Sequence, residues 1–196
     1  MRLAQTVPLF FAAAIAAGCG AADPTVKQAT GRPLEGDATL IAAAQKLSDA
    51  VGGCGKLGET PPQSKVVGLD KASIVMLACN QSSYAYTYRL FAVRAGQAPV
   101  LLSVPDYDAT GWFASDQAAM AEIDAGAGVL TTSRRNSDKG ECGSEGRYQW
   151  DGAHFTVQEM HYQDCAAKTK SGPPFPVIWP VQTGGELDPN GPTPAP

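Results

Sequence analysis

The sequence is poor in charge and lacks the signatures of several common protein classes. Charged residues make up only 17 % of the chain and no long basic run occurs, which argues against a nucleic-acid partner. There is no CxxC pair, no G-x-S-x-G elbow and no repeat of fixed period. The two histidines, His154 and His161, are separated by an odd offset that places them on opposite faces of a regular strand, which disfavours a zinc site. We therefore expect no cofactor.

The N-terminal apolar run, residues 7–17, is too short for a transmembrane helix, which needs about 20 residues. With Arg2 before it, this run predicts a signal peptide over residues 1–18. The letters IAAGC, ending at Cys19, resemble a bacterial lipobox, so we expect cleavage before Cys19 and lipidation of its thiol. The alternative is an ordinary signal peptide that is cut near Ala22 and discards Cys19. Both alternatives export the rest of the chain.

The expected address is the cell envelope. Gly20 after the lipidated cysteine favours the outer membrane, by resemblance to lipoprotein sorting signals. Residues 19–36 are small, polar and rich in turn formers, which indicates a flexible tether. Residues 37–182 are predicted to form a single domain. Residues 183–196 are rich in proline and have little to bury, so we expect them to be disordered.

Cysteine usage fits an oxidising compartment. Five cysteines minus a lipidated Cys19 leave an even number, Cys54, Cys79, Cys142 and Cys165. These four allow three pairings. We favour Cys54 with Cys79 and Cys142 with Cys165, because each of these pairs brackets one local unit.

Periodicity predicts a mainly β (α+β) domain, a single antiparallel meander or sandwich-like fold with one N-terminal helix. Asp37 precedes apolar residues at helical spacing up to Val51, and Gly52-Gly53 should end this helix. Strands are expected at residues 65–69, 73–79, 83–93, 99–104 and 129–134, a loop at 106–112, a short helix or strand at 116–123, and an extended arm packed over a sheet edge at 171–180.

Residues 139–165 predict a β-hairpin closed by a disulfide. Asp151-Gly152 is typical of a two-residue type I′ turn, which would set Trp150 opposite Ala153 and Tyr148 opposite Phe155. After Val157 the apolar positions change parity at Gln158-Glu159, which indicates a bulge.

The second half of the chain resembles a bacterial family of unknown function, DUF1176, found in predicted periplasmic proteins. The matching motifs are Gly140-Glu141-Cys142-Gly143, Trp150-Asp151-Gly152 with Phe155, Cys165, and Trp179-Pro180; upstream, Cys79 and Tyr84 match a C-x-x-G-A-Y-N motif in which Ser82, Ser83 and Ala85 replace other letters. The resemblance supports the disulfides and the envelope address, and it implies no activity.

Four candidate sites follow from local patterns. Asp106, Asp108 and Thr110 match the first half of a calcium loop, whose second half fails at Gln117. Tyr84, Tyr86 and Tyr88 share one face of a strand and could stack on glycan rings, although such a stripe is more often core. Arg134 and Arg135 form a basic loop that could meet an anionic partner. Cys142 could act as a thiol nucleophile if it were free and close to His154 or His161.

We expect a lipid-anchored envelope protein of binding or structural role and no enzyme, with the membrane, peptidoglycan or another envelope protein as partners. One alternative is an inhibitor of an envelope hydrolase, because residues 144–148, with Ser144, Arg147 and Tyr148, faintly resemble the S-G-x-x-Y loop of periplasmic lysozyme inhibitors. A second alternative is an enzyme that acts on the cell wall. An exposed loop at 144–148 would favour the inhibitor, exposed tyrosines a glycan-binding protein, and a free Cys142 the enzyme.

Overall fold

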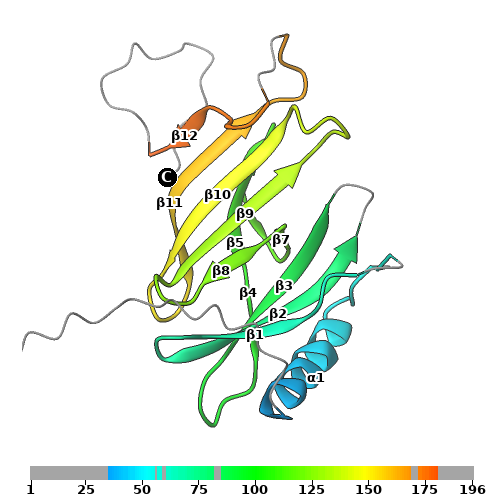
Figure 1. Cartoon of the computed structure of the whole chain (residues 1–196), viewed down its shortest axis with the longest axis vertical. Coiled ribbons are helices and arrows are strands. Elements are labelled where there is room, and N and C mark those ends of the chain that lie inside the picture. Colours follow the sequence, from blue (N-terminus) through cyan, green and yellow to red (C-terminus); the bar gives the residue numbers. More distant parts are fainter. Residues whose placement is uncertain (1–34, 56, 59–60, 82–84, 169–171, 181–196) are drawn as a thin grey trace, which may run out of the picture. The chain divides into compact units, whose positions relative to one another are not determined.

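The structure, a computed structural model, describes residues 35–55, 57–58, 61–81, 85–168 and 172–180. Its one helix in this part of the chain, α1 (Glu35–Ala50), contacts three strands that follow it, β1 (Lys65–Leu69), β2 (Ala72–Gln81) and β3 (Tyr86–Val93) (Figure 1). The helix ends where expected, since Gly52 and Gly53 take positive φ. Asp37 lies inside the first turn rather than before it, where a carboxylate still favours the positive end of the helix. No described helix is long and apolar enough to cross a membrane.

The first sheet has the order β1-β2-β3-β4, and the short strand β7 (Ala118–Ala119) pairs with β3. The predicted strand at 65–69 is confirmed, and a turn at Asp70-Lys71 joins it to β2. The expected strand at 99–104 is divided, because β4 (Val100–Leu102) pairs with β3 whereas β5 (Val104–Asp108) joins a separate hairpin.

That hairpin corrects the loop expected at 106–112. β5 pairs with β6 (Gly111–Ser115) across a two-residue connection, Ala109 and Thr110, in a two-stranded sheet of its own. Asp108 closes the turn, because its Oδ1 accepts hydrogen bonds from the backbone N–H and the hydroxyl of Thr110.

The second sheet has the order β12-β11-β10-β9-β8. Its strands are β8 (Glu122–Asp124), β9 (Val129–Arg135), β10 (Gly143–Trp150), β11 (Phe155–Gln163) and β12 (Val177–Trp179). The predicted strand at 129–134 is confirmed. The described part of the arm expected at 171–180, residues 172–180, covers a sheet edge as expected, with β12 paired to β11 and Phe175 buried.

The hairpin of β10 and β11 forms, but its predicted turn is wrong. Trp150 pairs with Phe155, so the loop has four residues, 151–154, and Tyr148 pairs with Val157. The Asp151 side chain explains the longer loop, because its Oδ1 accepts the backbone N–H groups of Ala153 and His154, each at 2.7 Å. The predicted bulge is confirmed: the register shifts at Gln158, and Met160 thereby returns to the buried face.

Alternation in β2 and β3 builds two hydrophobic clusters. One face of the pair, including Ile74, Met76 and Leu90, packs with residues of the second sheet such as Tyr148 and Phe155. The other face, with Val75, Leu77 and Phe91, packs against Ala44 of α1. Both expected disulfides are present, Cys54–Cys79 and Cys142–Cys165, so the fold is the antiparallel, doubly disulfide-bonded one that the sequence predicts.

Candidate functional site

An open, apolar groove lies where the β5–β6 hairpin meets the edge of the second sheet. Its volume is about 430 Å³, within the range of small-molecule and peptide side-chain sites. It is lined by Pro105 of β5, Trp112, Phe113 and Ala114 of β6, Val157 of β11 and Trp179 of β12. Four elements thus contribute to one apolar surface, and three of its six lining residues are aromatic.

The aromatic rings of the groove hold one another at steep angles. Trp112 and Trp179 lie edge to face, with centroids 6.3 Å apart and planes at 90°. Tyr107, which is buried, packs edge to face on Trp112 at 5.4 Å and contacts Tyr162 at 5.1 Å. Edge-to-face pairs fix ring orientation, so the half-buried tryptophans form a preformed floor and wall.

A polar cluster joins the β5–β6 hairpin to the second sheet. Arg134 of β9 donates to the Tyr107 carbonyl oxygen at 2.6 Å and pairs with Asp106 at 3.3 Å. The buried Ser144 hydroxyl donates to Asp106 at 2.8 Å, and the Tyr148 hydroxyl donates to the Pro105 carbonyl oxygen at 2.8 Å. We call these residues, Asp106, Arg134, Ser144 and Tyr148, the hairpin clamp.

Burial dominates the electrostatics of the hairpin clamp. Desolvation raises the pKa of Asp106 above its ordinary value, although Arg134, the Tyr107 N–H and the Ser144 hydroxyl favour the carboxylate. Burial also raises the pKa of the Tyr148 phenol, so this hydroxyl remains a hydrogen-bond donor at neutral pH. Arg134 additionally lies 5.2 Å from the ring centre of Phe113, which places its charge at the margin of the groove.

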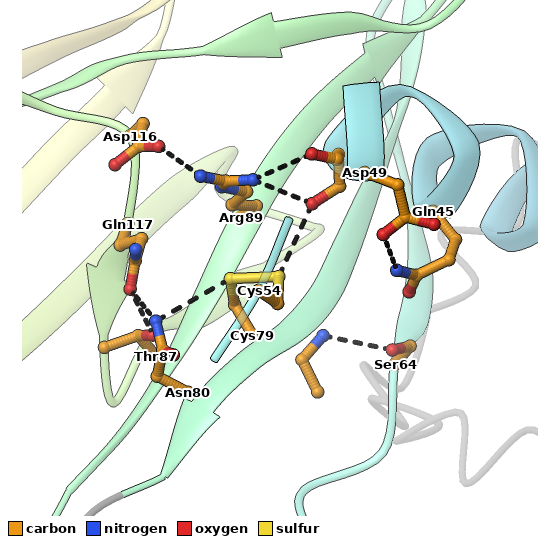
Figure 2. Close-up of a disulfide and its surroundings, with 12 residues drawn as sticks. Gln45, Asp49, Cys54, Ser64, Cys79, Asn80, Thr87, Arg89, Asp116 and Gln117 are labelled. Atoms are coloured by element: carbon orange, nitrogen blue, oxygen red, sulfur yellow. Dashed lines mark hydrogen bonds and ion pairs between the residues drawn. A yellow bond between two sulfur atoms is a disulfide. The ribbon is translucent and has the colours of Figure 1, made fainter. Parts of the chain in front are cut away.

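A second polar cluster surrounds the Cys54–Cys79 disulfide (Figure 2). Arg89 of β3 is buried; one of its terminal nitrogens donates to the carbonyl and hydroxyl oxygens of Ser48, at 3.2 and 2.9 Å, and the other pairs with Asp116 at 2.8 Å. The Ser48 hydroxyl also contacts Cys54 Sγ at 3.4 Å. These contacts tie the end of α1 to the first sheet. We call Ser48, Arg89 and Asp116 the helix clamp.

At its two described residues, Tyr86 and Tyr88, the predicted tyrosine stripe is not an exposed platform. Tyr84 lies outside the described residues. Tyr88 is 5 % exposed and belongs to the larger core, and Tyr86 is half-buried and packs edge to face on it at 5.6 Å. The glycan-stacking interpretation of this strand is therefore wrong for Tyr88, and the burial that the sequence favoured is found.

The residues expected to form partner loops lie in strands. Residues 144–148 belong to β10, a central strand in which Ser144 and Tyr148 are buried, so the exposed inhibitor-like loop does not exist; Arg147 remains exposed. Arg134 and Arg135 lie at the end of β9, and both are paired: Arg134 with Asp106, and Arg135 with Glu145 at 2.8 Å. Their charges are therefore neutralised locally.

The geometry of two further candidate sites, the calcium loop and the Cys142 nucleophile, does not fit the predicted chemistry. Asp106 is held by Arg134 and Ser144, and Asp108 by Thr110, in a hairpin rather than a cation loop; the described residues contain no group of three or more His, Cys, Asp or Glu that could hold a metal ion. Cys142 is bonded to Cys165, so its sulfur is not a free thiol. His161 bonds instead to Glu159 and to the Phe175 carbonyl oxygen.

Sequence reasoning missed the groove itself. A signal was present: the apolar run of residues 112–114 follows a turn that Asp108 and Gly111 favour, which is typical of a hairpin. The family motif includes Trp179, but nothing local in the sequence indicates that Trp112 lies beside it.

The observed class is a mainly antiparallel β domain with two disulfides and one covering helix, carrying an aromatic groove at a sheet edge. The chain belongs to the DUF1176 family, a family of proteins of unknown function, whose model matches residues 13–182. The resemblance inferred from the cysteine and tryptophan motifs is thereby confirmed. No curated protein and no solved structure matches the chain.

Proposed function

We propose that the protein is a lipid-anchored binding module of the bacterial cell envelope and that the aromatic groove is its binding site. The main observation that supports this proposal is the groove. Exposed apolar surface of this kind costs free energy in water, and contiguous patches rimmed by polar residues are typical of interaction sites. The N-terminal lipobox-like segment and the disulfides support an envelope address.

The hairpin clamp supports a site that is formed before the ligand arrives. Arg134, Asp106 and Ser144 fix β5, and the contact between Tyr107 and Trp112 fixes the ring that faces Trp179. A ligand therefore loses little free energy to ordering of the protein, which favours binding by a small apolar surface.

A pair of charge insertions tests the binding role. Ala114→Arg places a cation in the groove at an exposed position, whereas Val100→Arg places the same charge on β4, where Val100 is 50 % exposed and does not line the groove. Soluble peptidoglycan fragments and short apolar peptides are titrated separately, with tryptophan fluorescence as the readout because Trp112 and Trp179 line the site. We expect at least one ligand class to bind, with about tenfold weaker affinity in A114R and little change in V100R.

The binding role would be refuted if neither ligand class altered the fluorescence, or if both variants bound as the unmodified protein does. The anchor is tested independently by intact mass of the protein from its native membrane. We expect a chain that begins at an acylated Cys19, and a chain that begins near Ala22 would refute the lipid anchor.

A further inference from the structure

Strand β6 has an unpaired edge. Its only strand partner among the described residues is β5, with Trp112 opposite Tyr107, Phe113 opposite Asp106 and Ala114 opposite Pro105. In an antiparallel pair, residues alternate between those that bond to the partner strand and those whose N–H and C=O point away from it.

The register identifies the residues of β6 that point away. Pro105 has no N–H, so the pair of Pro105 and Ala114 cannot be the doubly hydrogen-bonded kind. The hairpin gives the same parity, because a two-residue connection closed by Asp108 and Gly111 makes that closing pair the bonded one. The backbone N–H and C=O groups of Trp112 and Ala114 are therefore directed to the open edge.

The groove adjoins β6. Pro105, Trp112 and Ala114 share one face of the hairpin, because Pro105 pairs with Ala114 and strand residues two apart point the same way. The groove also touches Phe113 between them, so it follows β6 over three consecutive residues. Backbone hydrogen-bonding groups and aromatic side chains are thus presented together.

Neither the composition nor the ends of β6 protect it from pairing. Natural edge strands commonly carry a lysine, a proline or a bulge, and the letters GWFAS contain none of these. Asp108 lies beside the start of the strand, opposite Gly111, and the whole chain has a formal net charge of -4, whereas Asp116 after the strand is already paired with Arg89. Arg134, which lies over the Phe113 ring, is already paired with Asp106.

We infer that the groove takes an extended peptide segment of an envelope protein partner, which adds as a strand to β6. This inference rests on the proposed function and names its ligand. The partner segment bonds to the outward N–H and C=O groups of Trp112 and Ala114 and directs alternate apolar side chains between Trp112 and Trp179. Lysine or arginine at one end of the segment complements Asp108, so affinity falls as salt is raised.

A backbone-methylated peptide separates strand addition from side-chain binding. The probe is a peptide of about eight residues with valine at alternate positions and a lysine at each end, close to the usual strand length. Two controls carry N-methyl groups on alternate backbone nitrogens, one set of each parity. Only one parity faces β6, so we expect one control to lose binding and the other to bind as the parent peptide does.

The protein-side test uses Ala114. Ala114→Pro deletes the outward N–H without removing a bond to β5, a position at which an edge strand accepts proline. Ala114→Ser is the matched control because it keeps the N–H. We expect about tenfold weaker peptide binding in A114P, near-parent binding in A114S, and unchanged circular dichroism in both.

The outcomes distinguish this inference from the proposed function. If both methylated peptides bind equally well, or if peptidoglycan fragments bind and peptides do not, strand addition is refuted while the groove remains a binding site. If the purified protein is a dimer that A114P makes monomeric, the edge is occupied by a second copy and the inference is refuted. If no probe binds, both the inference and the proposed function are refuted.

Discussion

The two sheets are covered by different elements, and of these two only the β5–β6 hairpin leaves a groove beside the sheet that it covers. Helix α1 closes the outer face of the first sheet, where Ala44, Val75 and Phe91 are 0 % exposed. The β5–β6 hairpin covers the end of the second sheet with larger rings, and Trp112, Phe113 and Trp179 stay half-buried around the groove. A small residue lets a helix approach closely, whereas a rigid hairpin of bulky rings does not close completely.

Each covering element is held by an arginine that bonds both a main-chain carbonyl and a carboxylate. The side chain of Arg89 in the helix clamp is 6 % exposed, and that of Arg134 in the hairpin clamp is 27 % exposed. The helix clamp lies beside a sealed core, so its loss should affect stability alone. The hairpin clamp positions groove residues, so its loss should affect stability and binding together.

The largest difference between the two regions should be seen with matched ring deletions. Phe91→Ala empties a fully buried site under α1 and should lower the free energy of unfolding by about 3–5 kcal/mol. Trp112→Ala removes a half-buried ring, so it should cost less stability and abolish ligand-induced fluorescence changes. Urea unfolding at constant m-value measures the first effect. A groove tryptophan that proved as costly as Phe91 would contradict the contrast between sealed and open regions.

The two disulfides test the same difference between the helix-covered region and the groove region, because the loops that they close are almost equal in length. The sequence separations are 25 for Cys54–Cys79 and 23 for Cys142–Cys165, so removing either pair with alanine should cost about 3 kcal/mol in the chain-entropy model. Only the second pair brackets the β10–β11 hairpin, whose β11 contributes Val157 to the groove and pairs with β12. We therefore expect the C142A/C165A variant to lose groove binding at a temperature at which C54A/C79A retains it.

Local signals in the sequence were sufficient for much of the fold. Helical spacing placed α1, a short apolar run placed β1, alternation placed the faces of β3, and cysteine bracketing gave both disulfides. The predicted two-residue turn at Asp151-Gly152 is wrong because the Asp-Gly pair occurs in more than one type of turn. The Asp151 carboxylate accepts two backbone N–H groups, and this favours the longer loop.

The candidate site could not be predicted because its contacts are not local. Arg134 lies 27 positions from Tyr107, and Ser144 lies 38 positions from Asp106, so no spacing rule relates these residues. The aspartates at 106 and 108 instead suggested a cation loop, since Asp and Gly favour turns whatever their function. The tyrosine stripe left two interpretations open, core and glycan platform, because alternation shows which residues share a face but not whether that face is covered.

A buried hydroxyl in the hairpin clamp should give a smaller effect with a matched control. Ser144→Ala removes the hydroxyl that donates to Asp106, which should lower the free energy of unfolding by about 1–2 kcal/mol and weaken groove binding. Ser133→Ala is the control: the Ser133 hydroxyl is also buried but has no partner among the described residues, so its loss should be neutral or slightly stabilising. Equal effects of the two substitutions would show that the clamp contributes nothing specific.

The smallest expected effect is a pH dependence of opposite sign at two aspartates. Burial raises the pKa of Asp106, so the native state binds this proton more tightly than the unfolded chain, and the contribution of Asp106 to stability decreases as pH rises through that raised value. The backbone N–H groups of His154 and Ala153 lower the pKa of Asp151, so its contribution is present above the ordinary aspartate value and is lost as pH falls through the lowered one. Unfolding free energies of D106N and D151N, measured by urea from about pH 3 to 6 at constant salt, test both signs. The difference between the unmodified protein and D106N should decrease with pH and that for D151N should increase, whereas parallel trends would mean that the desolvation of Asp106 does not distinguish the hairpin clamp from an exposed turn.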